Sequence, residues 1–304
     1  MTDISFTDRV AIVTGAGGGL GRTYALDLAA RGAAVVVNDL GGAKDGTGGD
    51  QTAAQKVVEE IEANGGRAVA SYDSVATPEG GQAIVDTAVN SFGKVDVVIN
   101  NAGILRDQTF AKLTDENLDA VLDVHLKGAF HVSRPAFRVM KENGYGRFVF
   151  TSSNAGVLGN FGQTNYGAAK MGLVGLSNVL ALEGAKANIK SNVICPMATT
   201  RMTEDLLGAM AGSLQPECVT PMVVFLCSEA SEYTHEVFSA GANRFARVFV
   251  GLVPGWFAGS KTQVSAEDVA ANIDQIRDQT GYTVPGSVAD EIGGLLELLK
   301  AEQA

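Results

Sequence analysis

The sequence predicts an α/β fold: a doubly wound parallel sheet covered by helices on both faces, followed by a C-terminal helical extension. Short Val- and Ile-rich runs alternate with longer amphipathic stretches, which is the pattern of successive strand–helix–strand units. The 304 residues are 46% hydrophobic and only 19% charged, enough apolar material for one large core plus an appendage. We therefore expect one domain over residues 1–255 and the extension over residues 256–304.

The first expected strand, residues 9–14, runs directly into a glycine-rich turn and then into a helix over residues 22–31. Glycines let the backbone adopt positive φ and approach a ligand closely, and a helix N-terminus offers unpaired N–H groups. The spacing differs from G-x-G-x-x-G, but the order strand, glycine turn, helix is typical of a pyrophosphate site. The candidate cofactor contacts in this turn are Gly15, Gly19, Leu20 and Gly21.

The second expected strand, residues 33–38, ends in Asp39, at the distance from the turn where a carboxylate meets the adenosine ribose of a dinucleotide. Asp39 would repel a 2′-phosphate, and no Lys or Arg lies in the turn or next to Asp39 in the sequence. The pattern therefore predicts NAD rather than NADP. The alternative is that Asp39 only caps the following loop. Residues 41–50 are too glycine-rich for a helix or strand and predict a mobile loop beside the adenosine end.

Further strands are expected at residues 67–72, 95–100, 147–151 and 191–195, with a long helix over residues 115–140. Because the carboxyl ends of parallel strands meet at one edge, residues that follow them should converge there. The site at this edge is predicted to contain the glycine turn, Asp39, Asn101, Ser153 and Pro196.

Ser153, Tyr166 and Lys170 form a candidate catalytic group. Ser153 follows the strand at 147–151, and a helix beginning near residue 165 places Tyr166 and Lys170 one turn apart on one face. A neighbouring ammonium lowers the pKa of a phenol, so Lys170 should make Tyr166 a better base, while the Ser153 hydroxyl orients the substrate oxygen. The chemistry indicated is interconversion of an alcohol and a carbonyl. The alternative is a half-buried tyrosine beside a solvated lysine.

Together with Asn100-Asn101-Ala102-Gly103, these motifs resemble the short-chain dehydrogenase/reductase family, which implies a Rossmann fold and the catalytic roles given above. The resemblance also implies the following cofactor contacts: Asn101, Ala102 and Gly103 along the adenosine, Asp73 and Ser74 near the adenine, Pro196 beside the nicotinamide, and Tyr166 with Lys170 at the nicotinamide ribose.

Two positions depart from the family pattern. Many members carry an Asn whose backbone carbonyl holds a relay water, and here the aligned residue is His125, whose carbonyl can serve equally. Met197 stands where a Gly usually follows Pro196. The contact to the nicotinamide carboxamide therefore stays open among Thr199, Thr200 and Thr203.

Within the family, residues 37–42, 100–107, 125–128, 159–166 and 198–203 are similar to the (3R)-hydroxyacyl-CoA dehydrogenase part of peroxisomal multifunctional enzymes of type two. This similarity implies NAD-linked oxidation of an acyl-CoA or sterol-CoA 3-hydroxy ester in β-oxidation, with hydratase and thiolase on separate chains. Three alternatives stay open: a 17β-type hydroxysteroid dehydrogenase, a 3-oxoacyl-carrier-protein reductase, and a catalytically silent NAD-binding sensor.

The formal net charge of −11 argues against nucleic acid or an anionic membrane as a partner. A CoA ester would then need a local basic patch, for which Lys44, Arg106 and Lys261 are candidates. The 3 cysteines lack C-x-x-C spacing, which suits a reducing compartment, and no His, Cys or carboxylate cluster has metal-ligand spacing. With no signal peptide, long apolar run or peroxisomal C-terminal address, we expect a cytoplasmic protein.

The extension is expected to begin a helix after an N-cap at Ser265 and to contain a second apolar-periodic stretch at residues 292–299. We expect it to cover the substrate mouth or to dock on a second subunit. The apolar helix at residues 171–183 and the helix at 115–140 belong, by the family resemblance, to a subunit interface, so a homodimer or homotetramer is expected.

Overall fold

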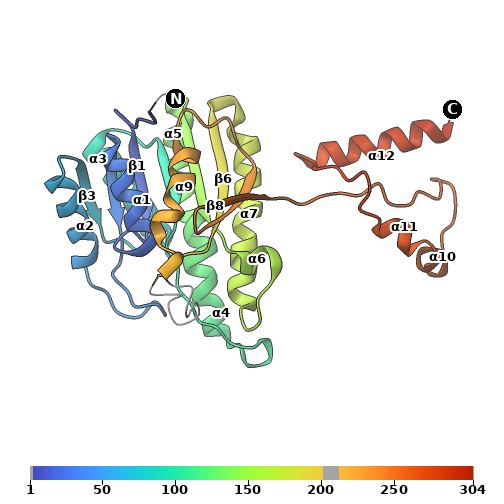
Figure 1. Ribbon diagram of the computed structural model, residues 1–304, viewed down its shortest axis with the longest axis horizontal. Coiled ribbons are helices and arrows are strands. Elements are labelled where there is room, and N and C mark those ends of the chain that lie inside the picture. The colour runs from blue at the N-terminus through green and yellow to red at the C-terminus, as the bar shows by residue number, and fades with distance from the viewer. Residues whose placement is uncertain (1–2, 201–211, 304) are drawn as a thin grey trace. The chain divides into compact units, whose positions relative to one another are not determined.

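A computed structural model describes residues 3–200 and 212–303, and its centre is an eight-stranded sheet in the order β3-β2-β1-β4-β5-β6-β7-β8 (Figure 1). The strands are β1 Val10–Thr14, β2 Ala34–Asn38, β3 Arg67–Ser71, β4 Val97–Asn100, β5 Gly146–Thr151, β6 Ile189–Pro196, β7 Glu236–Gly241 and β8 Arg244–Val248. Every recorded pairing from β3 to β7 is parallel. The chain leaves β1 in one direction across the sheet and returns to β4 on its other side, so the predicted doubly wound fold is confirmed.

Helices cover the sheet in two groups. They are α1 Gly19–Ala30, α2 Thr52–Ala63, α3 Pro78–Phe92, α4 Asp115–Leu122, α5 Gly128–Asn143, α6 Asn154–Leu158, α7 Thr164–Gly184 and α9 Thr220–Cys227. In one group α1 contacts α2 and α9; in the other α3 contacts α5, and α4 contacts α7. β1, β2 and β4 are buried along their whole length, as expected for parallel strands with both faces covered.

The long helix expected over residues 115–140 is interrupted. α4 ends at Leu122, a π-helical turn occupies Asp123–Lys127, and α5 begins at Gly128. A π turn adds one residue to the helix without changing its apolar character, so the sequence pattern does not reveal it. The turn directs His125 inward, where its side chain is buried.

The chain divides into two compact units, Met1–Arg247 and Val248–Ala304. The second contains α10 Ala266–Ala271, α11 Ile273–Arg277 and α12 Val288–Gln303. Ser265 caps α10 as predicted, and Asp268 completes a reciprocal capping box. None of residues 248–303 is fully buried. Docking of this unit over the substrate mouth or on a second subunit stays a prediction.

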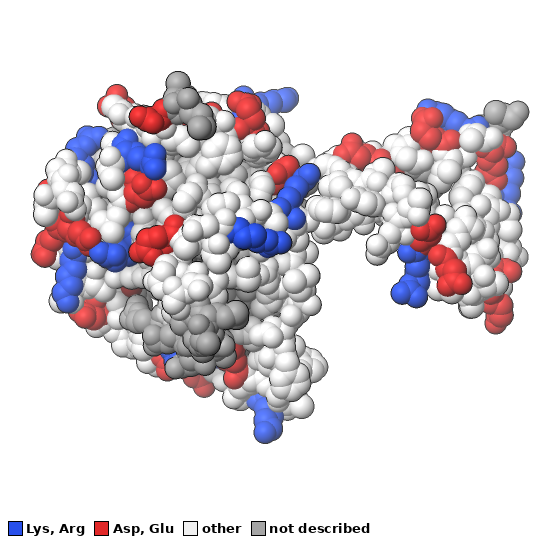
Figure 2. All heavy atoms as spheres, viewed as in Figure 1, with Lys and Arg blue, Asp and Glu red and all other residues white. Residues whose placement is uncertain are grey.

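On the face drawn in Figure 2, basic and acidic side chains lie interspersed. All 3 cysteines are free thiols. Among residues 3–200 and 212–303, no helix is long and apolar enough to cross a membrane, and no cluster of His, Cys, Asp or Glu side chains is placed to hold a metal ion.

Candidate active site

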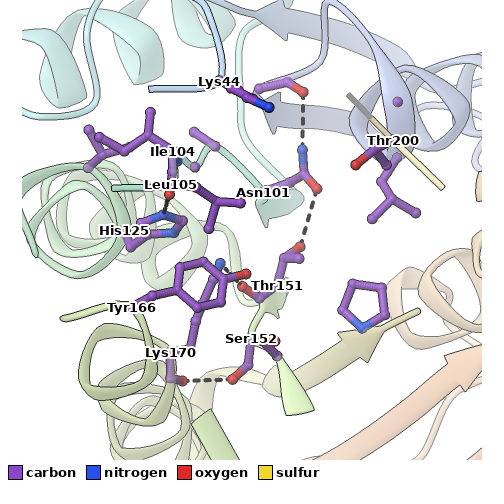
Figure 3. Close-up of a pocket in the computed structure, with 18 of the residues that line it drawn as sticks. Lys44, Asn101, Ile104, Leu105, His125, Thr151, Ser152, Tyr166, Lys170 and Thr200 are labelled. Atoms are coloured by element: carbon purple, nitrogen blue, oxygen red, sulfur yellow. Dashed lines mark hydrogen bonds between the residues drawn. The ribbon is translucent and has the colours of Figure 1, made fainter. Parts of the chain in front are cut away.

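One cavity of about 630 Å³ opens where the strands of the sheet end (Figure 3). Most of the predicted site residues line it: Gly15, Gly19, Leu20, Asp39, Asp73, Ser74, Asn101, Ala102, Gly103, His125, Ser153, Tyr166, Lys170 and Pro196. Met197 and Thr200 line it as well, whereas Thr203 lies outside the described residues. Motifs from six strand ends therefore share one space, which is large enough for a drug-sized or cofactor-sized ligand.

The glycine turn presents backbone rather than side chains to this cavity. Gly18 is the N-cap of α1 and has no side chain to occupy the first N–H groups of the helix, while Gly15 and Gly19 have φ of +63° and +53°. An uncapped helix N-terminus at the wall of a cavity fits a phosphate group.

Gly21 has a different role from the cofactor contact predicted for it. It does not line the cavity, and a Cβ added there would lie 2.2 Å from the carbonyl oxygen of Gly15. Gly21 therefore permits α1 to pack against the turn.

Asp39 joins the glycine turn to the loop that follows β2. One carboxylate oxygen accepts from the N–H of Gly17 at 2.7 Å, and the other accepts from the N–H of Gly41 at 2.7 Å. The capping alternative raised from the sequence is thus present in the structure. Asp39 also lines the cavity, so a ribose-binding role is compatible with the capping contacts.

Residues 40–50, which we call the crossing loop, contact the segment that follows β4. Leu105 N–H donates to the carbonyl of Lys44 at 2.8 Å, and Arg106 Nε donates to the carbonyl of Asp45 at 2.9 Å. These two hydrogen bonds anchor the crossing loop, which the sequence predicts to be mobile, to the segment after β4. Since Arg106 also donates to Asn117 at 3.2 Å, this candidate for a CoA patch is engaged within the fold.

The catalytic group lies at the end of β5 and the start of α7. Ser153 caps α6, its hydroxyl accepting from Ala155 N–H at 3.1 Å. Lys170 Nζ donates to the Thr151 carbonyl at 2.5 Å and lies 5.4 Å from the centre of the Tyr166 ring. Ser153, Tyr166 and Lys170 all line the cavity, as their spacing predicts. Figure 3 shows Tyr166 and Lys170 side by side.

Burial dominates the electrostatics of this group. It raises the pKa of Tyr166 to about 12, and the hydrogen bond with Ser153 offsets only part of that rise. Burial lowers the pKa of Lys170 from 10.5 to about 7. The lowering of the Tyr166 pKa that was expected from Lys170 is outweighed by burial, because desolvation disfavours the charged form of both groups.

The side chain of His125 contacts the segment after β4 and the Tyr166 ring, whereas the sequence pointed only to its backbone carbonyl. Its Nε2 lies 3.0 Å from the N of Ile104 and 2.7 Å from the O of Ile104. The imidazole stands edge-on to the Tyr166 ring, with centroids 5.2 Å apart and an interplanar angle of 89°. Burial holds the pKa of His125 well below 6.5, so the ring is neutral.

Sequence reasoning missed the side chains that fix the start of α7. Asn165 Nδ2 donates to the carbonyls of Arg106 at 3.0 Å and Asn117 at 3.2 Å, while its Oδ1 accepts from Tyr166 N–H at 2.8 Å. Gln163 Nε2 donates to the carboxylate of Asp107 at 2.7 Å. The available signal was the presence of amide side chains at Asn160, Gln163 and Asn165, shortly before Tyr166.

Asn101 links the cofactor turn to the catalytic strand. Its Nδ2 donates to the carbonyls of Thr14 and Gly15, each at 3.1 Å, and its Oδ1 accepts from Thr151 Oγ1 at 3.5 Å. Asn101 therefore connects the end of β1 and the first residue of the glycine turn with the end of β5.

The fold, the glycine turn and the Ser153–Tyr166–Lys170 group define a dehydrogenase of alcohol substrates, and the short chain dehydrogenase family matches residues 9–210. The chain belongs to this family: it is an oxidoreductase that acts on a CH–OH group with a nicotinamide cofactor, NAD or NADP. A short-chain type dehydrogenase/reductase of Mycobacterium tuberculosis is 53% identical over 280 residues, covering 92% of this chain and 97% of the relative.

Two similar proteins are longer. Peroxisomal multifunctional enzyme A of Dictyostelium discoideum is 47% identical over 302 residues, which are 99% of this chain and 67% of that protein. The structure of full-length peroxisomal multifunctional enzyme type 2 from Drosophila melanogaster matches with a TM-score of 0.83 and 38% identity, covering 98% of this chain and 50% of that one. The predicted resemblance to the dehydrogenase part of these enzymes is confirmed.

Proposed function

We propose that this chain is an NAD-dependent (3R)-3-hydroxyacyl-CoA dehydrogenase that oxidises a fatty or sterol-derived 3-hydroxyacyl-CoA to the 3-oxoacyl-CoA. The observation that carries the proposal is the 47% identity with a peroxisomal multifunctional enzyme across 99% of the chain. The preference for NAD rests on Asp39, whose carboxylate lines the cavity and would repel the 2′-phosphate of NADP.

The cavity supplies the groups that such an oxidation needs. Tyr166 would take the proton of the substrate hydroxyl, and Ser153, hydrogen-bonded to Tyr166, would orient the substrate oxygen. When bound, the oxidised nicotinamide brings a positive charge into the cavity and accepts the hydride from the carbinol carbon. Lys170 would hold the nicotinamide ribose and, when protonated, favour the ionised phenol.

The assembly we propose is a homodimer or homotetramer formed through α7. Met171, Val179 and Leu182 are exposed on this helix at 38%, 51% and 55% in the isolated chain. Apolar side chains gathered on one helix are typical of a covered surface. Sedimentation velocity should show more than one subunit per particle; a monomer at micromolar concentration would reject this part of the proposal.

The experiment is NADH formation from matched (3R)- and (3S)-3-hydroxyacyl-CoA esters, with NADP in a parallel assay. We expect turnover of the 3R ester with NAD and loss of that turnover in Tyr166→Phe, which keeps the ring but removes the group that moves the proton. Turnover of neither ester, with activity on free hydroxysteroids or carrier-protein esters, would replace the proposed substrate. An unchanged preference for NAD in Asp39→Ser would reject the role of Asp39.

A further inference from the structure

Lys44 enters the cofactor cavity from the crossing loop, which the sequence predicts to lie beside the adenosine end. It is five residues beyond Asp39 and yet lines the same cavity as Gly18 and Gly19 of the glycine turn. In Figure 3 its side chain enters on the side of Asn101 and Thr200, away from the catalytic pair.

The backbone of the crossing loop fixes this position. The Lys44 carbonyl accepts from Leu105 N–H at 2.8 Å, and the next residue, Asp45, accepts from Arg106 Nε at 2.9 Å. At Gly46 an added Cβ would lie 3.1 Å from the side chain of Ile104, so the loop approaches that segment closely. Because these contacts use main-chain atoms and Gly46, replacing the Lys44 side chain leaves them in place.

The charges around the cavity give Lys44 a specific place. Among the described residues that line it, the Lys and Arg side chains are Lys44 and Lys170, and the acidic ones are Asp39 and Asp73. Lys170 lies at the catalytic end and donates to Thr151. The adenosine half of the cavity therefore combines two carboxylates, the N-terminus of α1 and the Lys44 ammonium.

We propose that Lys44 binds the pyrophosphate of the bound dinucleotide, on the side opposite the glycine turn. The phosphates would then lie between the N–H groups of α1 and the ammonium, which together balance their charge and that of the neighbouring carboxylates. A 2′-phosphate is disfavoured as the partner because Asp39 occupies the ribose position. A CoA phosphate is disfavoured because the glycine turn that shares the cavity with Lys44 belongs to the cofactor.

Binding measurements on the full chain test this proposal without turnover. Calorimetric titrations with NAD, ADP-ribose, adenosine, NADP and CoA would compare wild type with Lys44→Gln, Lys44→Arg and Lys56→Gln. Lys56 is an exposed residue of α2 that does not line the cavity, so it controls for the loss of one positive charge. Adenosine controls for damage to the nucleoside pocket, since it lacks phosphate.

Lys44→Gln should weaken NAD and ADP-ribose by the same factor, about tenfold, as expected for the loss of a charge-assisted contact. Adenosine affinity should not change, Lys44→Arg should restore most of the loss, and Lys56→Gln should bind as wild type does. The loss should shrink in high salt if the ammonium remains partly hydrated.

An equal loss of affinity for adenosine and for NAD would show that the substitution distorts the loop, and this result would overturn the proposal. A loss confined to NADP, or confined to CoA, would assign Lys44 to that phosphate and overturn it equally, as would undiminished ADP-ribose affinity. The proposed substrate and the NAD preference can fail independently, because ADP-ribose binding requires neither.

Discussion

Replacing Lys170 by methionine measures how much stability the folded chain loses by burying the Lys170 ammonium. Lys170 is 3% exposed and its pKa falls from 10.5 to about 7 on folding. The folded pKa lies below the unfolded one, so between these values the unfolded chain binds more protons and stability rises with pH. Each pH unit corresponds to about 1.4 kcal/mol, so the full cost below pH 7 is about 5 kcal/mol.

The pH dependence separates this cost from lost packing. Lys170→Met also loses the hydrogen bond to Thr151, worth about 1 kcal/mol, but that loss varies little with pH. Between about pH 7.5 and 9.5, wild type should gain about 3 kcal/mol relative to Lys170→Met. Tyr166 contributes little slope in this window, because the window lies below 10, the ordinary pKa at which the phenol ionises in the unfolded chain.

Urea unfolding followed by circular dichroism at several pH values provides the measurement, with exposed Lys186→Met as the control for losing a surface charge. The free energy of unfolding of Lys170→Met, relative to that of wild type, should be highest at the lowest pH. The variant should have no dehydrogenase activity. A stability difference that stayed constant from neutral to alkaline pH would refute the reasoning, because it would mean that Lys170 titrates in the fold as it does in water.

Three further predictions concern the site. The kcat/KM for alcohol oxidation should rise from neutral to mildly alkaline pH, because the raised pKa of Tyr166 keeps the phenol protonated there; a maximum below neutral pH would contradict this. Gly21→Ala should weaken NAD binding and lower thermal stability by about 1–3 kcal/mol through overpacking. Gly294→Ala on α12, where an added Cβ meets no atom within 4 Å, should be neutral or stabilising, and equal effects of the two substitutions would reject the role assigned to Gly21. Asn165→Ala should reduce kcat much more than NAD affinity, because it releases the first turn of α7, which carries Tyr166. Steady-state kinetics measure kcat and calorimetric titration measures NAD affinity. A matched fall in both quantities would point to general unfolding instead.

The local sequence pattern was sufficient to predict most of the fold. The strand before the glycine turn, and the cap at Ser265, depend on neighbouring residues and lie where the sequence places them. The π turn at His125 does not follow from pattern, because its inward side chain is held by the distant backbone of Ile104. The same holds for Lys44, whose entry into the cavity requires hydrogen bonds between loops.

The candidate site shows the same division. The sequence motifs predicted that Ser153, Tyr166 and Lys170 lie in one site, but they did not predict the direction in which the pKa of Tyr166 shifts. Proximity to Lys170 suggests a lower value, whereas the degree of burial decides for a higher one, and burial is a property of the folded chain. Asn165 was missed for a similar reason, since its partners at Arg106 and Asn117 come from a different part of the chain.

The hydrogen bonds of Asn101 have a consequence for how this enzyme could diverge. A single amide connects the carbonyls that shape the cofactor turn with the threonine that ends the catalytic strand. A substitution at Asn101 would disturb the cofactor turn and the end of the catalytic strand at once. Neither of them could therefore be altered through this residue without a change in the other. Selection for new substrates would therefore find more freedom at the end of α6 and in the loop to α7, where Leu158 and Phe161 are 80% and 89% exposed.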